Sequence, residues 1–255
     1  MHDVSLALSV TWEPKTLRSR VWLFDLDNTL HDASHAAFGP TSQAMTDYIA
    51  AHLALPHTEA SALRQHYWGR YGATLLGLVR HDGVQAAHFL EQTHRLPGLE
   101  ERLRTSAHDR AALKRLKGRK FILTNAPRDY AMRVLTSLRL AGIFEGVISI
   151  EDMCMFGQMR PKPDRRMFRH VAAWLKVHPV RCILVEDSLA HLKAARGLGM
   201  RTAWMQRYLE GRFRGTLRNG HNLGHKRREV GVHPCPSPPY VCAKINSLLA
   251  LRHLR

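Results

Sequence analysis

The chain has 255 residues and a formal net charge of +17 at pH 7. Its apolar residues, 45% of the total, are enough for a packed hydrophobic core, either in one large domain or in a core domain with an inserted smaller domain. No apolar stretch reaches the roughly 18 residues of a membrane helix, and residues 1–20 hold only a short apolar run, so we expect neither a membrane span nor a signal peptide. The four cysteines are too few and scattered for a disulfide framework, which predicts a reducing, cytoplasmic location.

The first predicted element is a buried strand over Val21–Phe24, which ends directly before Asp25 and Asp27. Two carboxylates at the end of a core strand repel each other and lose hydration unless a cation or a transferable proton lies between them. Their spacing puts both on one side of an extended backbone, so Asp25 can act as a nucleophile and Asp27 as a proton donor. The alternative is a helix N-terminus, where Asp, Asn and Thr are common caps.

Helical spacing replaces the strand pattern after Leu30, with Pro and Gly residues between the helices. The predicted helices cover residues 41–53, 58–71, 73–80 and 85–95. Helices between the first strand and its next partner predict a helical cap domain over residues 32–97. The cap is inserted into a core domain made of residues 1–31 and 98–255.

Strands and helices alternate in the remainder of the core. The predicted strands cover residues 121–123, 147–150, 182–185 and 202–205, and the predicted helices cover 109–117, 130–140, 164–175 and 189–198. This alternation predicts an α/β fold with a doubly wound, Rossmann-like parallel sheet. Ligands bind beyond the carboxyl ends of such strands, where Asp25, Thr124 and Asp187 should converge.

Three further motifs follow the acid pair: Thr124-Asn125 at one strand end, Lys162 between two prolines, and Glu186-Asp187 at another strand end. In this order the motifs resemble the four motifs of the haloacid dehalogenase superfamily, over roughly residues 20–206. The pyrimidine 5'-nucleotidase branch of that superfamily is similar at residues 25–30, 71–72, 77–78, 124–126 and 186–188.

The resemblance implies a phosphomonoester hydrolase that forms an aspartyl-phosphate on Asp25. One Mg²⁺ would be held by the Asp25 carboxylate, the Asp27 backbone carbonyl and Asp187. Asp27 would protonate the leaving oxygen and later activate water, which argues against dehalogenation because halide leaves without a proton. Glu186 either assists the metal site or holds Lys162. The alternative for Glu186 and Asp187 is a pair of acids that stabilise a helix N-terminus.

Phosphate oxygens would be bound by Thr124, Asn125 and Lys162. Taken singly, the first two residues could instead cap a helix, and the lysine could be a solvated surface residue. The chain carries His191 where the family usually has Asn after the fourth motif, so metal affinity should be weaker.

Substrate selection is assigned to the cap, where Tyr71 and Arg80 are candidate contacts, and His31, which follows the nucleophile loop, is expected to line the mouth of the pocket. The branch resemblance implies a pyrimidine nucleoside 5'-monophosphate, UMP or CMP, as substrate. The alternatives are a phosphatase or phosphomutase that acts on phosphoglycolate or a sugar phosphate.

Residues 207–239 are rich in Arg, Lys, Gly, His and Pro and predict a mobile basic loop before a final helix at 246–254. The loop could bind polyanions non-specifically, which makes a nucleic-acid-associated protein the alternative from another functional class. His221, His225, Cys235 and Cys242 match no zinc-finger spacing.

Overall fold

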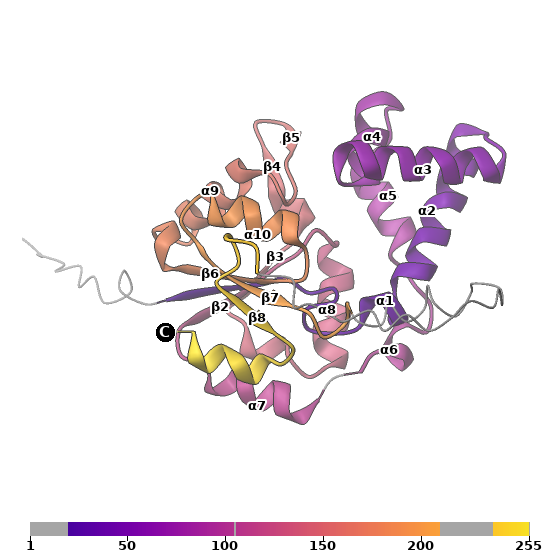
Figure 1. Ribbon diagram of the computed structural model, residues 1–255. Helices are drawn as coiled ribbons and strands as arrows, with labels where there is room; N and C mark the ends of the chain where they lie inside the picture. Colours follow the sequence, from indigo (N-terminus) through magenta and orange to yellow (C-terminus); the bar gives the residue numbers. More distant parts are fainter. Residues whose placement is uncertain (1–19, 105, 210–236, 255) are drawn as a thin grey trace, which may run out of the picture.

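The computed structural model describes residues 20–104, 106–209 and 237–254. Its centre is a six-stranded sheet of order β3-β2-β1-β6-β7-β8, in which every neighbouring pair is parallel (Figure 1). The strands are β1 (Val21–Phe24), β2 (Arg119–Leu123), β3 (Gly146–Ile148), β6 (Cys182–Glu186), β7 (Arg201–Met205) and β8 (Ala243–Ile245). The predicted doubly wound parallel sheet is confirmed.

β1 is an apolar run because it lies inside the sheet and is buried on both faces. Alternate side chains of the strand point to opposite faces, so Trp22 and Phe24 join one apolar cluster while Val21 and Leu23 join the other. Helices α7 (Ala107–Arg115) and α8 (Arg128–Ser137) and the terminal 3-10 helix η5 (Leu248–His253) cover the first face, and α9 (Arg165–Trp174) and α10 (Leu189–Arg196) cover the second (Figure 1).

A group of helices between β1 and β2 stands beside the sheet (Figure 1). It consists of α2 (Phe38–Leu53), α3 (His57–Tyr71), α4 (Thr74–His81) and α5 (Ala86–Thr93), flanked by the short helices α1 (Ala33–Ala36) and α6 (Leu99–Arg102). These helices bury an apolar cluster of their own that includes Ile49, Tyr67 and Phe89. The predicted helices of this region are confirmed, and its limits at residues 32 and 97 remain our proposal for the domain division.

Packing against Tyr67 explains why position 77 is a glycine. A Cβ atom at this position would lie 2.1 Å from Cγ of the Tyr67 ring. Glycine therefore allows α4 to pack directly against the aromatic face of α3.

Several elements were not predicted. A two-stranded antiparallel hairpin, β4 (Cys154–Met155) and β5 (Gln158–Met159), follows β3 and reaches toward the cap helices (Figure 1). Ile150 and Met159 pack on the apolar cluster of the cap, so this region joins core and cap. The remaining 3-10 helices are η2 (Ala141–Ile143), η3 (Ile150–Met153) and η4 (Pro179–Arg181). The predicted final helix is the shorter 3-10 helix η5, which follows the unpredicted strand β8.

Most of the predicted basic loop, residues 210–236, lies outside the described residues, as do His221, His225 and Cys235. At the start of the loop, Arg207 is anchored: its guanidinium pairs with the buried Asp109 and donates to the backbone oxygen of Asn246. Free thiols occur at Cys154, Cys182 and Cys242. Among the described residues, no helix combines the length and apolar character needed to cross a membrane.

Candidate active site

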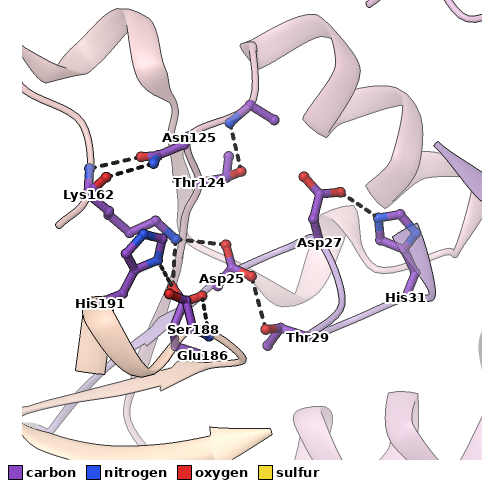
Figure 2. Close-up of polar contacts among 11 residues, drawn as sticks. Asp25, Asp27, Thr29, His31, Thr124, Asn125, Lys162, Glu186, Ser188 and His191 are labelled. Carbon is purple, nitrogen blue, oxygen red and sulfur yellow. Dashed lines mark hydrogen bonds and ion pairs between the residues drawn. The ribbon is translucent and has the colours of Figure 1, made fainter. Parts of the chain in front are cut away.

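The predicted motifs meet at the carboxyl edge of the sheet. Phe24 pairs with Ile122 of β2 and with Val185 of β6, so the three strands end side by side. This register brings together Asp25, Thr124 and Glu186, and Lys162 approaches them from the loop before α9 (Figure 2). The structure therefore places residues far apart in sequence around one site, as expected.

Lys162 is a buried ion-pair partner, which rules out the surface alternative. Its Nζ atom donates to Oδ1 of Asp25 at 2.7 Å and to Oε2 of Glu186 at 2.8 Å (Figure 2). Burial opposes the positive charge, but the two carboxylates outweigh it and hold the pKa of Lys162 well above its usual value. The ammonium is therefore permanently charged inside the site.

Asn125 holds the backbone of Lys162 with both ends of its amide. Nδ2 donates to the Lys162 carbonyl oxygen and Oδ1 accepts from the Lys162 N–H, each at 2.9 Å (Figure 2). Thr124 is buried next to it, and its hydroxyl oxygen accepts from the backbone N–H of Ala126 at 3.0 Å. Asn125 thus positions the lysine, and the phosphate contacts of Thr124 and Asn125 stay predictions.

Asp25 is enclosed. Its Oδ2 accepts from the Thr29 hydroxyl at 2.9 Å, and its backbone N–H donates to the Val185 carbonyl at 2.9 Å. Burial first, and the Glu186 carboxylate next, raise the pKa of Asp25 to about 6 against the opposing effect of Lys162.

Glu186 is also buried, but it has cationic and hydrogen-bonding neighbours. Its Oε1 accepts from the backbone N–H of Ser188 at 3.2 Å, and Nδ1 of His191 lies 3.1 Å from its Oε2. Burial alone would raise its pKa, but Lys162, followed by His191, holds the pKa of Glu186 well below the usual range. His191 therefore lies beside the fourth motif, in contact with its first acid.

The acidic residues of the site suit a divalent cation. Asp25, Glu186 and Asp187 each offer a carboxylate oxygen, and these oxygens lie within 4.8 Å of one another. Burial, Asp25 and Glu186 raise the pKa of Asp187 to about 9 because three carboxylates share a single ammonium. Carboxylate oxygens gathered at one site are the hard ligands that Mg²⁺ prefers. The geometry is compatible with both roles expected of Glu186, because this residue holds Lys162 and also lies in one group with the predicted ligands Asp25 and Asp187.

Asp27 has separate partners. Its Oδ1 accepts from the Tyr130 hydroxyl at 2.8 Å and lies 3.0 Å from Nε2 of His31. Burial and the negative charge of Asp27 raise the pKa of Tyr130 well above its usual value, so the phenol keeps its proton. The His31 side chain is 0% exposed, so it does not line the mouth of the site as expected but lies beside the proton donor.

Tyr130 is a residue that the sequence analysis missed. It lies in the first turn of α8, the helix that follows Thr124 and β2. A tyrosine in the first turn of the helix that leaves a motif-bearing strand could have indicated this position, because that turn faces the carboxyl edge of the sheet.

The two other candidate substrate contacts lie in the cap helices. The Tyr71 hydroxyl lies 2.6 Å from Nε2 of His81, and the Arg70 guanidinium lies over the Tyr71 ring. Arg80 is exposed at the end of α4. Tyr71 thus contributes to cap packing, and substrate contact by Tyr71 or Arg80 stays a prediction.

Two known proteins are similar to the chain in sequence. The chain is 24% identical over 194 residues to phosphate metabolism protein 8 of Saccharomyces cerevisiae, covering 71% of this chain and 60% of that protein. It is 32% identical over 79 residues to validoxylamine A 7'-phosphate phosphatase of Streptomyces hygroscopicus subsp. limoneus, covering 31% and 35%. The chain therefore spans less than two thirds of the length of either relative.

Solved structures share the fold across nearly the whole chain. The crystal structure of a haloacid dehalogenase-type phosphatase from Thermococcus onnurineus superposes with a TM-score of 0.57 at 20% identity, covering 92% of this chain and 97% of that one. A family model described as haloacid dehalogenase-like hydrolase matches residues 20–199, the stretch that contains every motif of the site. The chain belongs to the haloacid dehalogenase-like hydrolase family.

Proposed function

We propose that the chain is a Mg²⁺-dependent phosphomonoester hydrolase that works through an aspartyl-phosphate on Asp25. The observation that carries this proposal is the difference between two acids on one strand end. Asp25 is enclosed with Lys162 and the acidic cluster, whereas Asp27 is held apart by Tyr130 and His31. Unlike environments for neighbouring carboxyl groups are typical of a nucleophile paired with a proton donor.

In the first step, a carboxylate oxygen of Asp25 forms a bond to phosphorus while the bond between phosphorus and the ester oxygen breaks. The electron pair of that bond stays on the leaving oxygen, which takes the proton from Asp27 and departs as an alcohol. The Lys162 ammonium offsets negative charge on the phosphoryl oxygens, and the Thr124 hydroxyl donates a hydrogen bond to them.

The Asp25 carboxylate, the Asp27 backbone carbonyl and Asp187 would hold Mg²⁺, with Glu186 as a further candidate ligand, and the ion would supply additional positive charge for the phosphoryl group. In the second step, Asp27 takes a proton from water, and the water oxygen forms a bond to phosphorus. The bond between phosphorus and Asp25 then breaks, which returns the free carboxylate and releases inorganic phosphate.

For the substrate we propose a pyrimidine nucleoside 5'-monophosphate. Support comes from the branch motifs in the sequence and from cap helices that could bind a base far from phosphorus. Gly77 belongs to those motifs, and the packing of α4 on Tyr67 accounts for it without a substrate. The alternative is a phosphate ester of another kind, such as phosphoglycolate or a sugar phosphate.

The test is a panel of phosphomonoesters with Mg²⁺ and free phosphate as the readout: UMP, CMP, AMP, GMP, phosphoglycolate and glucose 1-phosphate. We expect kcat/KM for UMP or CMP to lead by at least about tenfold, which is about 1.4 kcal/mol of transition-state binding. A lead by phosphoglycolate or the hexose phosphate would refute the nucleotide assignment and leave the chemistry standing.

The chemistry itself is tested by Asp25→Asn, which should abolish turnover of every substrate because an amide cannot form the acyl-phosphate. Asp27→Asn should retain substrate binding but lose hydrolysis of alkyl phosphates. Asp47→Asn, which changes an exposed carboxylate on α2, is the matched control and should behave as the wild type. Wild-type turnover by Asp25→Asn would overturn the mechanism.

A further inference from the structure

Two side chains from different parts of the core contact the same oxygen of Asp27. Tyr130, from the first turn of α8, reaches Oδ1 at 2.8 Å, and His31, which forms a β-bridge with Asp27, reaches the same atom at 3.0 Å. In Figure 2 the other oxygen of Asp27 points away from His31. One edge of the carboxyl group is thus enclosed by protein, and the side chain as a whole keeps 20% of its surface exposed.

The hydrogens of both contacts point at Oδ1. A phenol next to a carboxylate donates its proton to the hydrogen bond. Nδ1 of His31 is buried and has no hydrogen-bond partner among the described residues, whereas Nε2 faces the carboxylate. A hydrogen on Nδ1 would be buried without an acceptor, so the neutral ring carries its hydrogen on Nε2.

We propose that Tyr130 and His31 are positioning residues that hold Oδ1 of Asp27 and turn Oδ2 toward the ester oxygen of the substrate. This inference rests on the proposed function. Since both hydrogen bonds end on Oδ1, the proton that Asp27 transfers is carried on Oδ2. Without the two donors the carboxyl group of Asp27 could rotate about its Cβ–Cγ bond and present either oxygen, or neither, to the leaving group.

The two donors are themselves held in place. The Tyr130 ring is buried and makes a T-shaped contact with the His94 ring, with ring centroids 5.8 Å apart at an interplanar angle of 71°. His31 has no exposed surface, and its chain neighbours are fixed, because Leu30 is buried and Asp32 caps α1. The hydrogen-bond geometry at Oδ1 is therefore set by packing within the protein and needs no substrate to form.

The test compares two substrates that differ in their need for a proton. UMP releases an alcohol and requires protonation of the leaving oxygen, whereas p-nitrophenyl phosphate releases a stable phenolate. We expect Tyr130→Phe, which removes one hydroxyl, to lower kcat for UMP at least about tenfold more than kcat for p-nitrophenyl phosphate, with a small change in KM. His31→Leu should show the same selective loss.

Two controls separate positioning from damage to the fold. Tyr48→Phe removes a hydroxyl that contacts His88 in the cap and should change neither substrate. His31→Gln places an amide N–H near the position of Nε2 and should recover most of the UMP activity that His31→Leu loses. Melting temperatures of all variants show whether each one folds.

An equal loss on both substrates, or no loss on either, for both Tyr130→Phe and His31→Leu would overturn the proposal. A selective loss in Tyr48→Phe would also overturn it. If only the nucleotide assignment were wrong, the leading alkyl phosphate of the panel would replace UMP in this comparison. If the chemistry were wrong, the wild type would show no turnover of either substrate that depends on Asp25, which is a different result from any of these.

Discussion

Replacement of Lys162 by Met should destabilise the metal-free protein strongly. The substitution removes the ammonium that bridges Asp25 and Glu186 at 2.7 and 2.8 Å, but keeps an unbranched side chain of similar volume. The decrease in the free energy of unfolding will therefore measure the effect of the missing charge and not that of a cavity. Removing one partner of a buried ion pair typically reduces the free energy of unfolding by about 3–5 kcal/mol, because the remaining charge stays buried without compensation.

Two conditions should restore part of this stability. Acid should do so, since the pKa of Asp25 is already raised to about 6 and must rise further without the ammonium, so protonation removes the repulsion at mildly acidic pH. Mg²⁺ should do so at neutral pH, by about 2.7 kcal/mol at a free concentration of about 100 times Kd.

The assay is denaturant unfolding followed by circular dichroism, in EDTA and in Mg²⁺, at pH 5.5 and 7.5. A loss of about 4 kcal/mol corresponds to a fall in Tm of about 10 °C for a chain of this size. Lys120→Met, at a surface lysine that donates to the Gly118 carbonyl, is the matched control and should change stability by less than about 0.5 kcal/mol. A loss below about 1 kcal/mol for Lys162→Met in EDTA at pH 7.5 would refute the reasoning.

Two further predictions follow from the site and the cap. Because the pKa of Asp187 is raised to about 9 without metal, Mg²⁺ must displace a proton, so its apparent affinity should increase by about tenfold per pH unit from about pH 7 and level off near pH 9. Calorimetric titration at several pH values measures this, and a pH-independent affinity would contradict it. Gly77→Ala should strain the packing of α4 on Tyr67 by about 1–3 kcal/mol. We expect faster amide hydrogen exchange in α3 and α4 and unchanged exchange in the sheet. Unchanged exchange in the cap helices would show that the substitution causes no strain there.

The sheet strands that could be predicted, the edge strand β3 among them, each contain at least two consecutive apolar residues. β1, β2, β6 and β7 are buried inside the sheet, and burial on both faces leaves a run of apolar residues that can be read directly. β8 has only the sequence Ala-Lys-Ile at the sheet edge, and the β4–β5 hairpin has two residues in each strand. Neither has enough residues for a periodic pattern, so both depend on contacts that form only in the folded chain.

The active site also has features that the sequence predicts and features that it does not. The motifs at the strand ends could be brought together from sequence because parallel strands end at one edge of a sheet. The contacts of Asn125 with the Lys162 backbone, and of Tyr130 and His31 with one oxygen of Asp27, depend on loop paths and rotamers. Sequence spacing indicates which residues gather, but it does not determine which atom of a carboxyl group is held.

The sheet extends past the stretch that is similar to the family, and this affects how the protein can be shortened. The family model ends at residue 199, before β7, β8 and η5. A chain cut there would retain every motif of the site but leave the outer edge of β6 without its partner, exposing backbone groups that can pair with other molecules. It would also lose the buried side chains of Leu248 and Leu251, which cover Trp22 and its neighbours. The shortened hydrolase should therefore aggregate. The unit that folds extends beyond the part of the chain that carries the catalytic motifs.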